Sequence, residues 1–220
     1  MKRKVNDINN SRRGFLATLG ALGAAGVMRA ADKLTDGGLA PLEEKRNSGR
    51  QTPVVPPGAI SVRNFYTHCT GCQLCVAACP NGLLKPTTRA ERFMQPVMGY
   101  DNGYCRPECV RCSQVCPTGA IRPITRAQKT DISIGTAKLY IDECMAAKGE
   151  ARCGLCERHC PVQAIVMQKL AADDTSELAP RRPVVSEHRC IGCGACENVC
   201  PVNPTSAIRV EGRLTHADIS

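Results

Sequence analysis

The chain has 220 residues and 16 cysteines but no Trp, 3 Phe and 4 Tyr, so large aromatic side chains add little to any hydrophobic core. We therefore expect bound metal to supply much of the folding free energy, because a metal that holds its ligands also holds the chain that carries them. The net charge is +9, but a surplus of five positive charges lies in residues 1–31, which leaves +4 for the rest of the chain. Because the rest also lacks a basic patch interleaved with aromatic residues, we exclude a nucleic-acid-binding protein.

The first segment, residues 1–31, has the features of an export signal. A basic start is followed by "SRRGFLA" (11–17) and by an apolar run from Phe15 to Met28 that is too short to cross a bilayer, which takes about 20 residues. "SRRGFLA" resembles the twin-arginine (Tat) motif, with Arg12 and Arg13 as the pair. We expect export by the Tat route to the periplasm or to the outer face of the cytoplasmic membrane. Cleavage near Ala24 and retention as an anchor both stay open.

Residues 32–57 contain Gly37, Gly38 and four prolines, and they show no hydrophobic periodicity. This composition predicts a flexible linker. The folded unit is expected to span residues 58–212, and residues 213–220 are expected to form a tail.

Four cysteine groups follow, near residues 60–85, 100–125, 137–168 and 183–212, and each group ends in Cys-Pro. Together they use every cysteine of the chain: Cys69, Cys72, Cys75 and Cys79; Cys105, Cys109, Cys112 and Cys116; Cys144, Cys153, Cys156 and Cys160; Cys190, Cys193, Cys196 and Cys200. A repeated unit of this kind sets the architecture of the whole region.

Short β-rich stretches flank the groups, at residues 119–124, 138–143, 164–168, 182–187 and 206–211, and no long helical pattern occurs. Each repeat is read as strand, cysteine loop, short helix and strand. The predicted fold class is α+β, with two ferredoxin-like dicluster modules behind the signal segment and the tether.

The spacing C-x2-C-x2-C-x3-C-P in the first and fourth groups is that of bacterial two-cluster ferredoxins. Structural zinc normally takes two separated C-x2-C pairs, and cysteines three apart on one loop are poorly placed to form disulfides with each other. We therefore predict four [4Fe–4S] clusters with all sixteen cysteines as ligands. The wider first gaps of the second and third groups leave a lost or three-iron cluster open at the third group.

With these motifs the chain resembles the NapG/MauM family of ferredoxin-type proteins. The likeness includes "SRRGFLA", the "PPGA" at 56–59, the long gap between Cys144 and Cys153, and "CIGCGACENVCP" followed by "SAI". The resemblance implies an exported four-cluster protein that relays electrons from a membrane quinol-oxidising partner, a NapH-like protein, to a periplasmic acceptor. It implies membrane association through that partner or through an uncleaved signal segment.

In two-cluster ferredoxins the fourth cysteine of one group ligates the cluster of the other. Sequential pairing would join groups one with two and three with four, whereas nested pairing would join one with four and two with three. Residues 81–103 lack the Ala-Ile strand that follows the other groups, which favours nesting, as does the resemblance to four-cluster electron-transfer subunits. The favoured sets are Cys69, Cys72, Cys75 and Cys200; Cys190, Cys193, Cys196 and Cys79; Cys105, Cys109, Cys112 and Cys160; Cys144, Cys153, Cys156 and Cys116.

The sequence shows no nucleophile set and no phosphate loop, so the chain is expected to have no catalytic site of its own. The expected function is single-electron relay within a quinol dehydrogenase. An electron-transfer subunit of an exported molybdopterin enzyme or other oxidoreductase, and a non-redox module stabilised by its clusters, remain alternatives.

Overall fold

The computed structural model describes residues 35–36, 40–41, 49–171 and 179–218. The chain divides into two compact units, Met1–Glu43 and Glu44–Ser220. In the first unit the described residues form a two-stranded antiparallel pair, β1 (Thr35–Asp36) with β2 (Ala40–Pro41). The predicted signal segment, residues 1–31, lies outside the described residues. All sixteen cysteines belong to the second unit.

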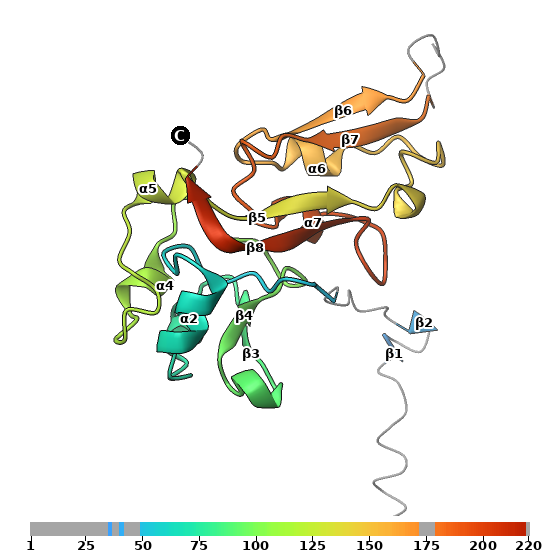
Figure 1. The fold of residues 1–220 in the computed structure, drawn as a ribbon. Helices are drawn as coiled ribbons and strands as arrows, with labels where there is room; N and C mark the ends of the chain where they lie inside the picture. Colours follow the sequence, from blue (N-terminus) through green and yellow to red (C-terminus); the bar gives the residue numbers. More distant parts are fainter. Residues whose placement is uncertain (1–34, 37–39, 42–48, 172–178, 219–220) are drawn as a thin grey trace, which may run out of the picture. The chain divides into compact units, whose positions relative to one another are not determined.

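The second unit holds short helices and two-stranded sheets (Figure 1). Its first half, here called the first module (residues 58–130), contains α2 (Val62–His68), α3 (Leu74–Ala78), β3 (Leu84–Pro86), the 3₁₀ turn η1 (Ala90–Arg92), β4 (Pro96–Met98), α4 (Arg111–Gln114) and α5 (Arg126–Thr130). The second module (residues 131–218) contains β5 (Ile132–Leu139), the 3₁₀ turn η2 (Ile141–Glu143), α6 (Leu155–Arg158), β6 (Ile165–Lys169), β7 (Arg181–Val185), α7 (Ala195–Asn198) and β8 (Ile208–Asp218).

Two antiparallel pairs build the second module. β5, which precedes the third cysteine group, pairs with β8, which follows the fourth, and β6 pairs with β7 between the two groups. The predicted strands at 164–168 and 182–187 are thus confirmed closely. The predicted strand at 138–143 is only partly right, because the chain turns into η2 after Leu139.

In the first module, one expectation was wrong, because residues 119–124 form no strand. The hairpin β3–β4 within residues 84–98, with Leu84 opposite Met98, was not predicted. Apolar side chains on this hairpin, Leu84 and Met98, are buried, so burial rather than local propensity accounts for the strands. The hairpin reverses the chain between the first and second cysteine groups.

The boundaries of the folded unit differ from those predicted. Residues 49–57 are not a free linker, because Val54 and Val55 are fully buried in the main core and the Gly212 N–H donates to Thr52 O at 3.1 Å. The predicted tail is wrong for residues 213–218, which continue β8 (Figure 1). A bridge between Ser61 and Thr215 joins this end of β8 to the start of α2.

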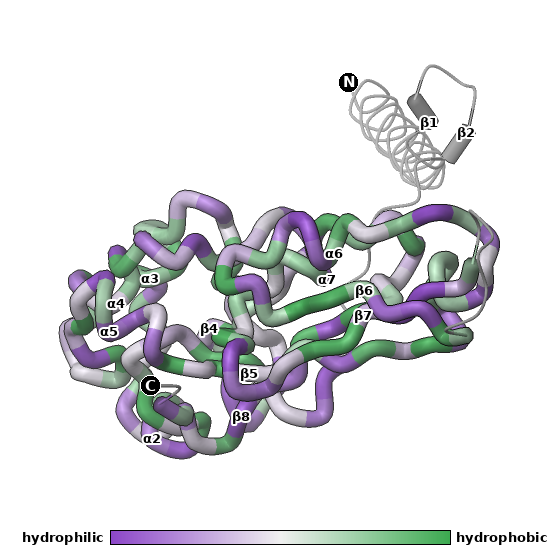
Figure 2. Tube along the Cα trace, turned by 90° about the horizontal axis from the view of Figure 1, so that it is seen from above, coloured by the Kyte–Doolittle hydropathy of each residue, from purple (hydrophilic) through white to green (hydrophobic). Residues whose placement is uncertain are grey.

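One core cluster runs through both modules, and its largest fully buried side chains are Tyr100 and Phe65. Seen from above, α3 and α4 lie at one end of the second unit, and α6 and α7 lie nearer the other (Figure 2). Two of the few aromatic residues, Tyr100 and Phe65, therefore lie in the core, in the same cluster as several of the cysteines.

Candidate iron–sulfur sites

The four helices α3, α4, α6 and α7 each carry the third cysteine of a group: Cys75, Cys112, Cys156 and Cys196. The loops before α3 and α7 curl through left-handed backbone, with Gly71 at φ +69° and Gly194 at φ +79°. Glycine adopts this region without the steric cost of a Cβ atom. The tight curl lets three successive cysteines of one loop point to one side.

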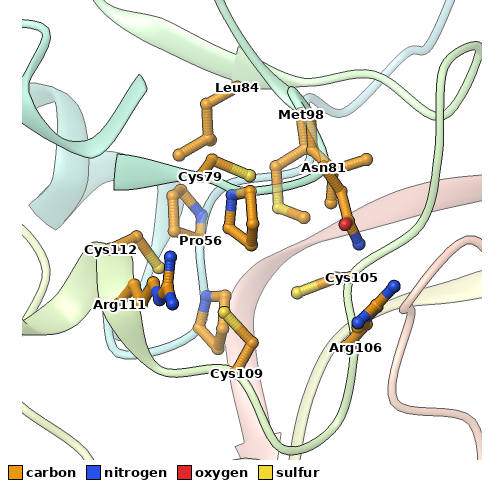
Figure 3. Close-up of a pocket in the computed structure, with 13 residues that line it drawn as sticks. Pro56, Cys79, Asn81, Leu84, Met98, Cys105, Arg106, Cys109, Arg111 and Cys112 are labelled. Atoms are coloured by element: carbon orange, nitrogen blue, oxygen red, sulfur yellow. The ribbon is translucent and has the colours of Figure 1, made fainter. Parts of the chain in front are cut away.

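The first three cysteines of the second group and the last cysteine of the first group form one site. Cys79, Cys105, Cys109 and Cys112 line a cavity with about 400 Å³ of space between atoms, and their sulfurs point into it from different directions (Figure 3). We call these four residues site B.

Two similar cavities lie in the second module. One, with about 290 Å³ between atoms, is lined by Cys160, Cys190, Cys193 and Cys196, which we call site C. The other, with about 330 Å³, is lined by Cys144, Cys153, Cys156 and Cys200, which we call site D.

Site A consists of Cys69, Cys72, Cys75 and Cys116. Burial, followed by the nearby charges of Cys69, Cys72 and Cys116, raises the pKa of Cys75 to about 11. Burial and the charges of Cys116 and Cys72 likewise raise the pKa of Cys69. Cys72 is exposed, so site A reaches the protein surface.

These sets correct the predicted pairing. Cys79 lies with the second group and not with the fourth, and Cys200 lies with the third group and not with the first. The structure therefore has sequential pairing, and the nested assignment is wrong. The physical cause is the hairpin β3–β4, which folds the second group back onto the first, as β6–β7 does for the third and fourth.

Burial favours the neutral thiols, because a thiolate loses its hydration there. It is the largest cause that raises the pKa of Cys112, Cys156 and Cys193, each to about 12. At neutral pH these side chains are thiols until a metal takes the place of the proton. Loading of the sites therefore releases protons.

Backbone amides donate to the fourth cysteines of the second and third groups. The Ala164 N–H donates to Cys160 Sγ at 3.2 Å, and the Ile121 N–H donates to Cys116 Sγ at 3.4 Å. Burial raises the pKa of Cys116, but hydrogen bonds from Ile121, Thr118 and Ala120 together lower it by more, so the net pKa is lowered. Such bonds also favour the reduced, more negative state of a cluster.

A buried cation, Lys129, lies beside site B. Its side chain is 4 % exposed, and its ammonium donates to the carbonyl oxygens of Arg106, at 2.5 Å, and of Cys109. Burial raises the pKa of Cys105, and the positive charge of Lys129 offsets part of that increase. Nothing in the sequence marked Lys129, because α5 is a short solvent-edge helix with an ordinary Thr125–Gln128 capping box.

The donor sets fit an iron–sulfur cluster better than the rival ligands. All sixteen cysteines are free, so no disulfide framework is present among them. A zinc ion with Zn–S bonds of about 2.3 Å would bring its sulfurs within about 4 Å of one another. At sites B, C and D the four cysteines instead surround a cavity, as ligands of a larger four-iron unit would.

In the part of the chain that the structure describes, none of the helices has both the length and the apolar character needed to cross a membrane.

Comparison with known proteins agrees with this geometry. The family described as "4Fe-4S dicluster domain" matches residues 68–120, which contain the first and second cysteine groups, and residues 151–204, which contain the fourth group and all of the third except Cys144. The chain is 35% identical over 230 residues to the ferredoxin-type protein NapG of Escherichia coli (strain K12), covering 94% of this chain and 90% of that protein. It is 30% identical over 176 residues to the methylamine utilization ferredoxin-type protein MauM of Methylobacillus flagellatus, covering 77% and 72%.

A third relative, the ferredoxin-type protein NapF of Escherichia coli (strain K12), is 30% identical over 152 residues, which cover 69% of this chain and 82% of that protein. The cysteine sets and these relatives identify an iron–sulfur protein with [4Fe–4S] dicluster domains and a role in electron transfer. The chain belongs to the NapG/MauM family of ferredoxin-type proteins.

Proposed function

We propose that the protein holds four [4Fe–4S] clusters, one each at sites A, B, C and D, and relays single electrons through them. The observation that carries the proposal is the gathering of all sixteen cysteines into four sets of four. When bound, a cluster supplies one-electron redox chemistry without a change in its ligands. The chain itself provides thiolate ligands, buries or half-buries all of them except Cys72, and donates amide hydrogen bonds to the sulfurs of Cys116 and Cys160.

The electron donor in this proposal is a membrane quinol-oxidising partner of the NapH type, and the acceptor is a periplasmic reductase system. Similarity to both NapG and NapF supports a Nap-type context. The exposed Cys72 at site A gives a surface point at which a partner's redox centre could approach closely.

Export by the Tat route to the periplasm, or to the outer face of the cytoplasmic membrane, belongs to the same proposal. It rests on "SRRGFLA" at residues 11–17, and on the need to build clusters in a reducing compartment before export. Replacing Arg12 and Arg13 together by Lys is expected to leave loaded protein in the cytoplasm. Normal export of this variant would remove the Tat part of the proposal and leave the electron relay untouched.

Similarity to MauM, whose name places it in methylamine utilization, favours a second candidate for the pathway. The same four-site relay would then serve a different periplasmic oxidoreductase. Co-purification from native membranes discriminates between the two, since the bound partner is either a quinol-oxidising membrane protein or a large redox enzyme.

The relay is tested by anaerobic purification with iron and acid-labile sulfide analysis and Mössbauer spectroscopy. Four clusters require about 16 Fe and 16 sulfides per chain. Reduction of these clusters by membranes supplied with quinol tests the donor. Bound zinc without labile sulfide would contradict the four-cluster relay. Clusters that no quinol-linked donor reduces would contradict the proposed donor.

A further inference from the structure

The two modules meet at two cysteine ligands. The backbone N–H of Cys105, in site B, donates to the carbonyl oxygen of Cys193, in site C, at 2.8 Å. The two residues also pack in one cluster of buried and half-buried side chains. Around this contact Ile191 and Ala195 are buried against Tyr104 and Cys105.

The other neighbouring sites lie within a module. Helix α3, with Cys75 of site A, packs against α4, with Cys112 of site B, and α6, with Cys156 of site D, packs against α7, with Cys196 of site C. The sites therefore follow one another in the order A, B, C, D, which differs from the order of the cysteine groups in the chain. Sites B and C are the inner pair.

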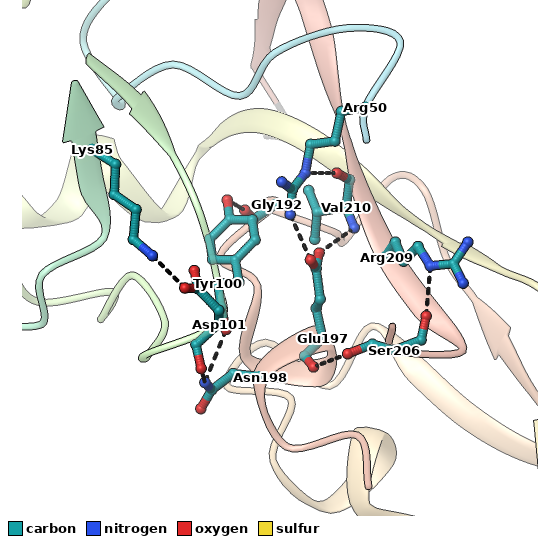
Figure 4. Close-up of polar contacts among 10 residues, drawn as sticks. All are labelled: Arg50, Lys85, Tyr100, Asp101, Gly192, Glu197, Asn198, Ser206, Arg209 and Val210. Atoms are coloured by element: carbon teal, nitrogen blue, oxygen red, sulfur yellow. Dashed lines mark hydrogen bonds and ion pairs between the residues drawn. The ribbon is translucent and has the colours of Figure 1, made fainter. Parts of the chain in front are cut away.

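Tyr100 fixes the contact between the modules (Figure 4). Its ring is fully buried, and its hydroxyl donates to Gly192 O at 2.7 Å. The Asn198 side chain in turn donates to Tyr100 O at 2.9 Å. The ring fills the space over Gly194, where a Cβ atom would lie only 2.1 Å from Tyr100 Cδ1. Tyr100, in the first module, thereby holds the loop that carries Cys193, in the second module.

We propose that electrons pass between the two modules at the Cys105–Cys193 contact, from site B to site C or back, and that Tyr100 is the positioning residue that keeps these two sites in electronic contact. The proposal rests on the proposed function. In each event one electron is lost on one side and gained on the other, with no bond broken and no proton moved. The hydrogen bond gives a direct route because it joins ligand residues of the two sites.

The test uses variants that disturb the contact without removing a ligand. Gly194→Ala puts a methyl group into the Tyr100 ring, and Tyr100→Leu removes the ring. Tyr100→Phe keeps the ring. Gly119→Ala is the matched control, because Gly119 also has positive φ (+72°) but has nothing within 4 Å of the added Cβ.

The first measurement isolates the inner pair. In a chain that carries Cys72→Ala and Cys153→Ala to empty sites A and D, the reduced protein should show an EPR splitting from magnetic interaction between sites B and C. Gly194→Ala and Tyr100→Leu should abolish this splitting, and Tyr100→Phe and Gly119→Ala should retain it. Iron analysis of each variant checks that sites B and C are still filled.

The second measurement uses the full chain and does not depend on electron transfer. In hydrogen exchange followed by mass spectrometry, the peptide containing the Cys105 amide should lose protection in Gly194→Ala and Tyr100→Leu but not in Gly119→Ala. If sites B and C are filled in the parent but show no splitting, the inference is wrong. It is also wrong if Gly194→Ala and Tyr100→Leu both keep the splitting and the protection of the parent. Missing iron and sulfide in the unaltered protein would instead overturn the proposed function.

Discussion

Lys129 shows how one buried side chain can adjust a redox site. Its ammonium lies against the loop that carries Cys105 and Cys109. A nearby positive charge stabilises the more negative, reduced state of a cluster. We predict that Lys129→Met makes the reduction potential at site B more negative, as measured by an EPR-monitored redox titration.

Lys138→Met is the control for this potential, because Lys138 is exposed on β5 and lies in the other module. It should leave the site B potential unchanged. Equal shifts in the two variants would show that net charge, and not the position of Lys129, is responsible.

Glu197 is held in a buried ion pair. Its carboxylate accepts from Arg50 Nη2 at 2.5 Å and from the Val210 N–H at 2.7 Å, and the Arg50 and Glu197 side chains are 6% and 5% exposed (Figure 4). Removing one partner of such a pair leaves a buried charge, at a cost of about 3–5 kcal/mol. Glu197→Gln should lower the denaturant midpoint accordingly.

The matched control is Glu150→Gln. Glu150 pairs with Lys148, but both side chains are largely exposed, and such pairs contribute about 0–1 kcal/mol. If the two substitutions lower the midpoint of unfolding equally, the Arg50–Glu197 pair has no special role.

His216 makes stability depend on pH. It is partly buried in β8, neither of its ring nitrogens has a hydrogen-bond partner among the described residues, and burial lowers its pKa to about 4. The unfolded chain takes up this proton near pH 6.5, but the folded chain does not. The folded state therefore loses stability as the pH falls from about 6.5 towards 4.

We predict that this loss is on the order of 1–2 kcal/mol at pH 5 relative to pH 7.5. His216→Leu should remove that part of the pH dependence, measured by denaturation at both pH values, whereas His188→Leu, at an exposed position, should not. The same pH dependence in all three proteins would place its cause elsewhere.

At the scale of elements, the N-terminal approach to the first module is part of the fold. Residues 49–57 bury Val54 and Val55 and supply Arg50 to its ion pair with Glu197. Full burial of a valine contributes roughly 1.5–3 kcal/mol. The segment therefore covers apolar surface that would otherwise face water.

A chain that begins at Glu44 is expected to fold and keep its clusters, and one that begins at Gly58 is expected to lose them rapidly. Thermal unfolding and the rate of loss of visible cluster absorbance measure this difference. Equal stability of the two shortened chains would restore residues 49–57 to the role of a tether.

The elements were predictable where the chemistry is local. Cysteine spacing predicts the short helices and curled loops, and short β-rich stretches predict β6 and β7. The burial of Val54 and the hairpin β3–β4 depend on contacts with distant residues, such as the hydrogen bond from Met98 N to Val54 O, and no local pattern records them. The prediction of nested pairing failed for the same reason. The absence of an Ala-Ile strand after the first group does not indicate where the hairpin returns the chain.

The whole molecule combines two sequential two-site modules on one shared core. Tyr100 and Phe65 lie in a core cluster that also contains Cys75, Cys190 and Cys196, so packing and ligand placement are inseparable. The fourth cysteine of every group leaves its own loop for the neighbouring site of the same module. This exchange of Cys79 with Cys116, and of Cys160 with Cys200, ties the two cysteine groups of each module together.

The exchange can be read from iron content. With four clusters, the parent holds about 16 Fe, and loss of one ligand by Cys→Ala is expected to cost one cluster, or about 4 Fe. Cys79 and Cys109 share site B, so the double variant Cys79→Ala/Cys109→Ala should lose no more iron than either single variant. Cys79 and Cys193 belong to different sites, so Cys79→Ala/Cys193→Ala should lose about 8 Fe. Nested pairing requires the reverse, with Cys79 and Cys193 on one cluster and additive losses for Cys79 and Cys109. Iron and labile-sulfide analysis of these two double variants, purified anaerobically beside their single variants, therefore distinguishes sequential from nested pairing. The pair of cysteines whose iron losses are not additive shares one cluster.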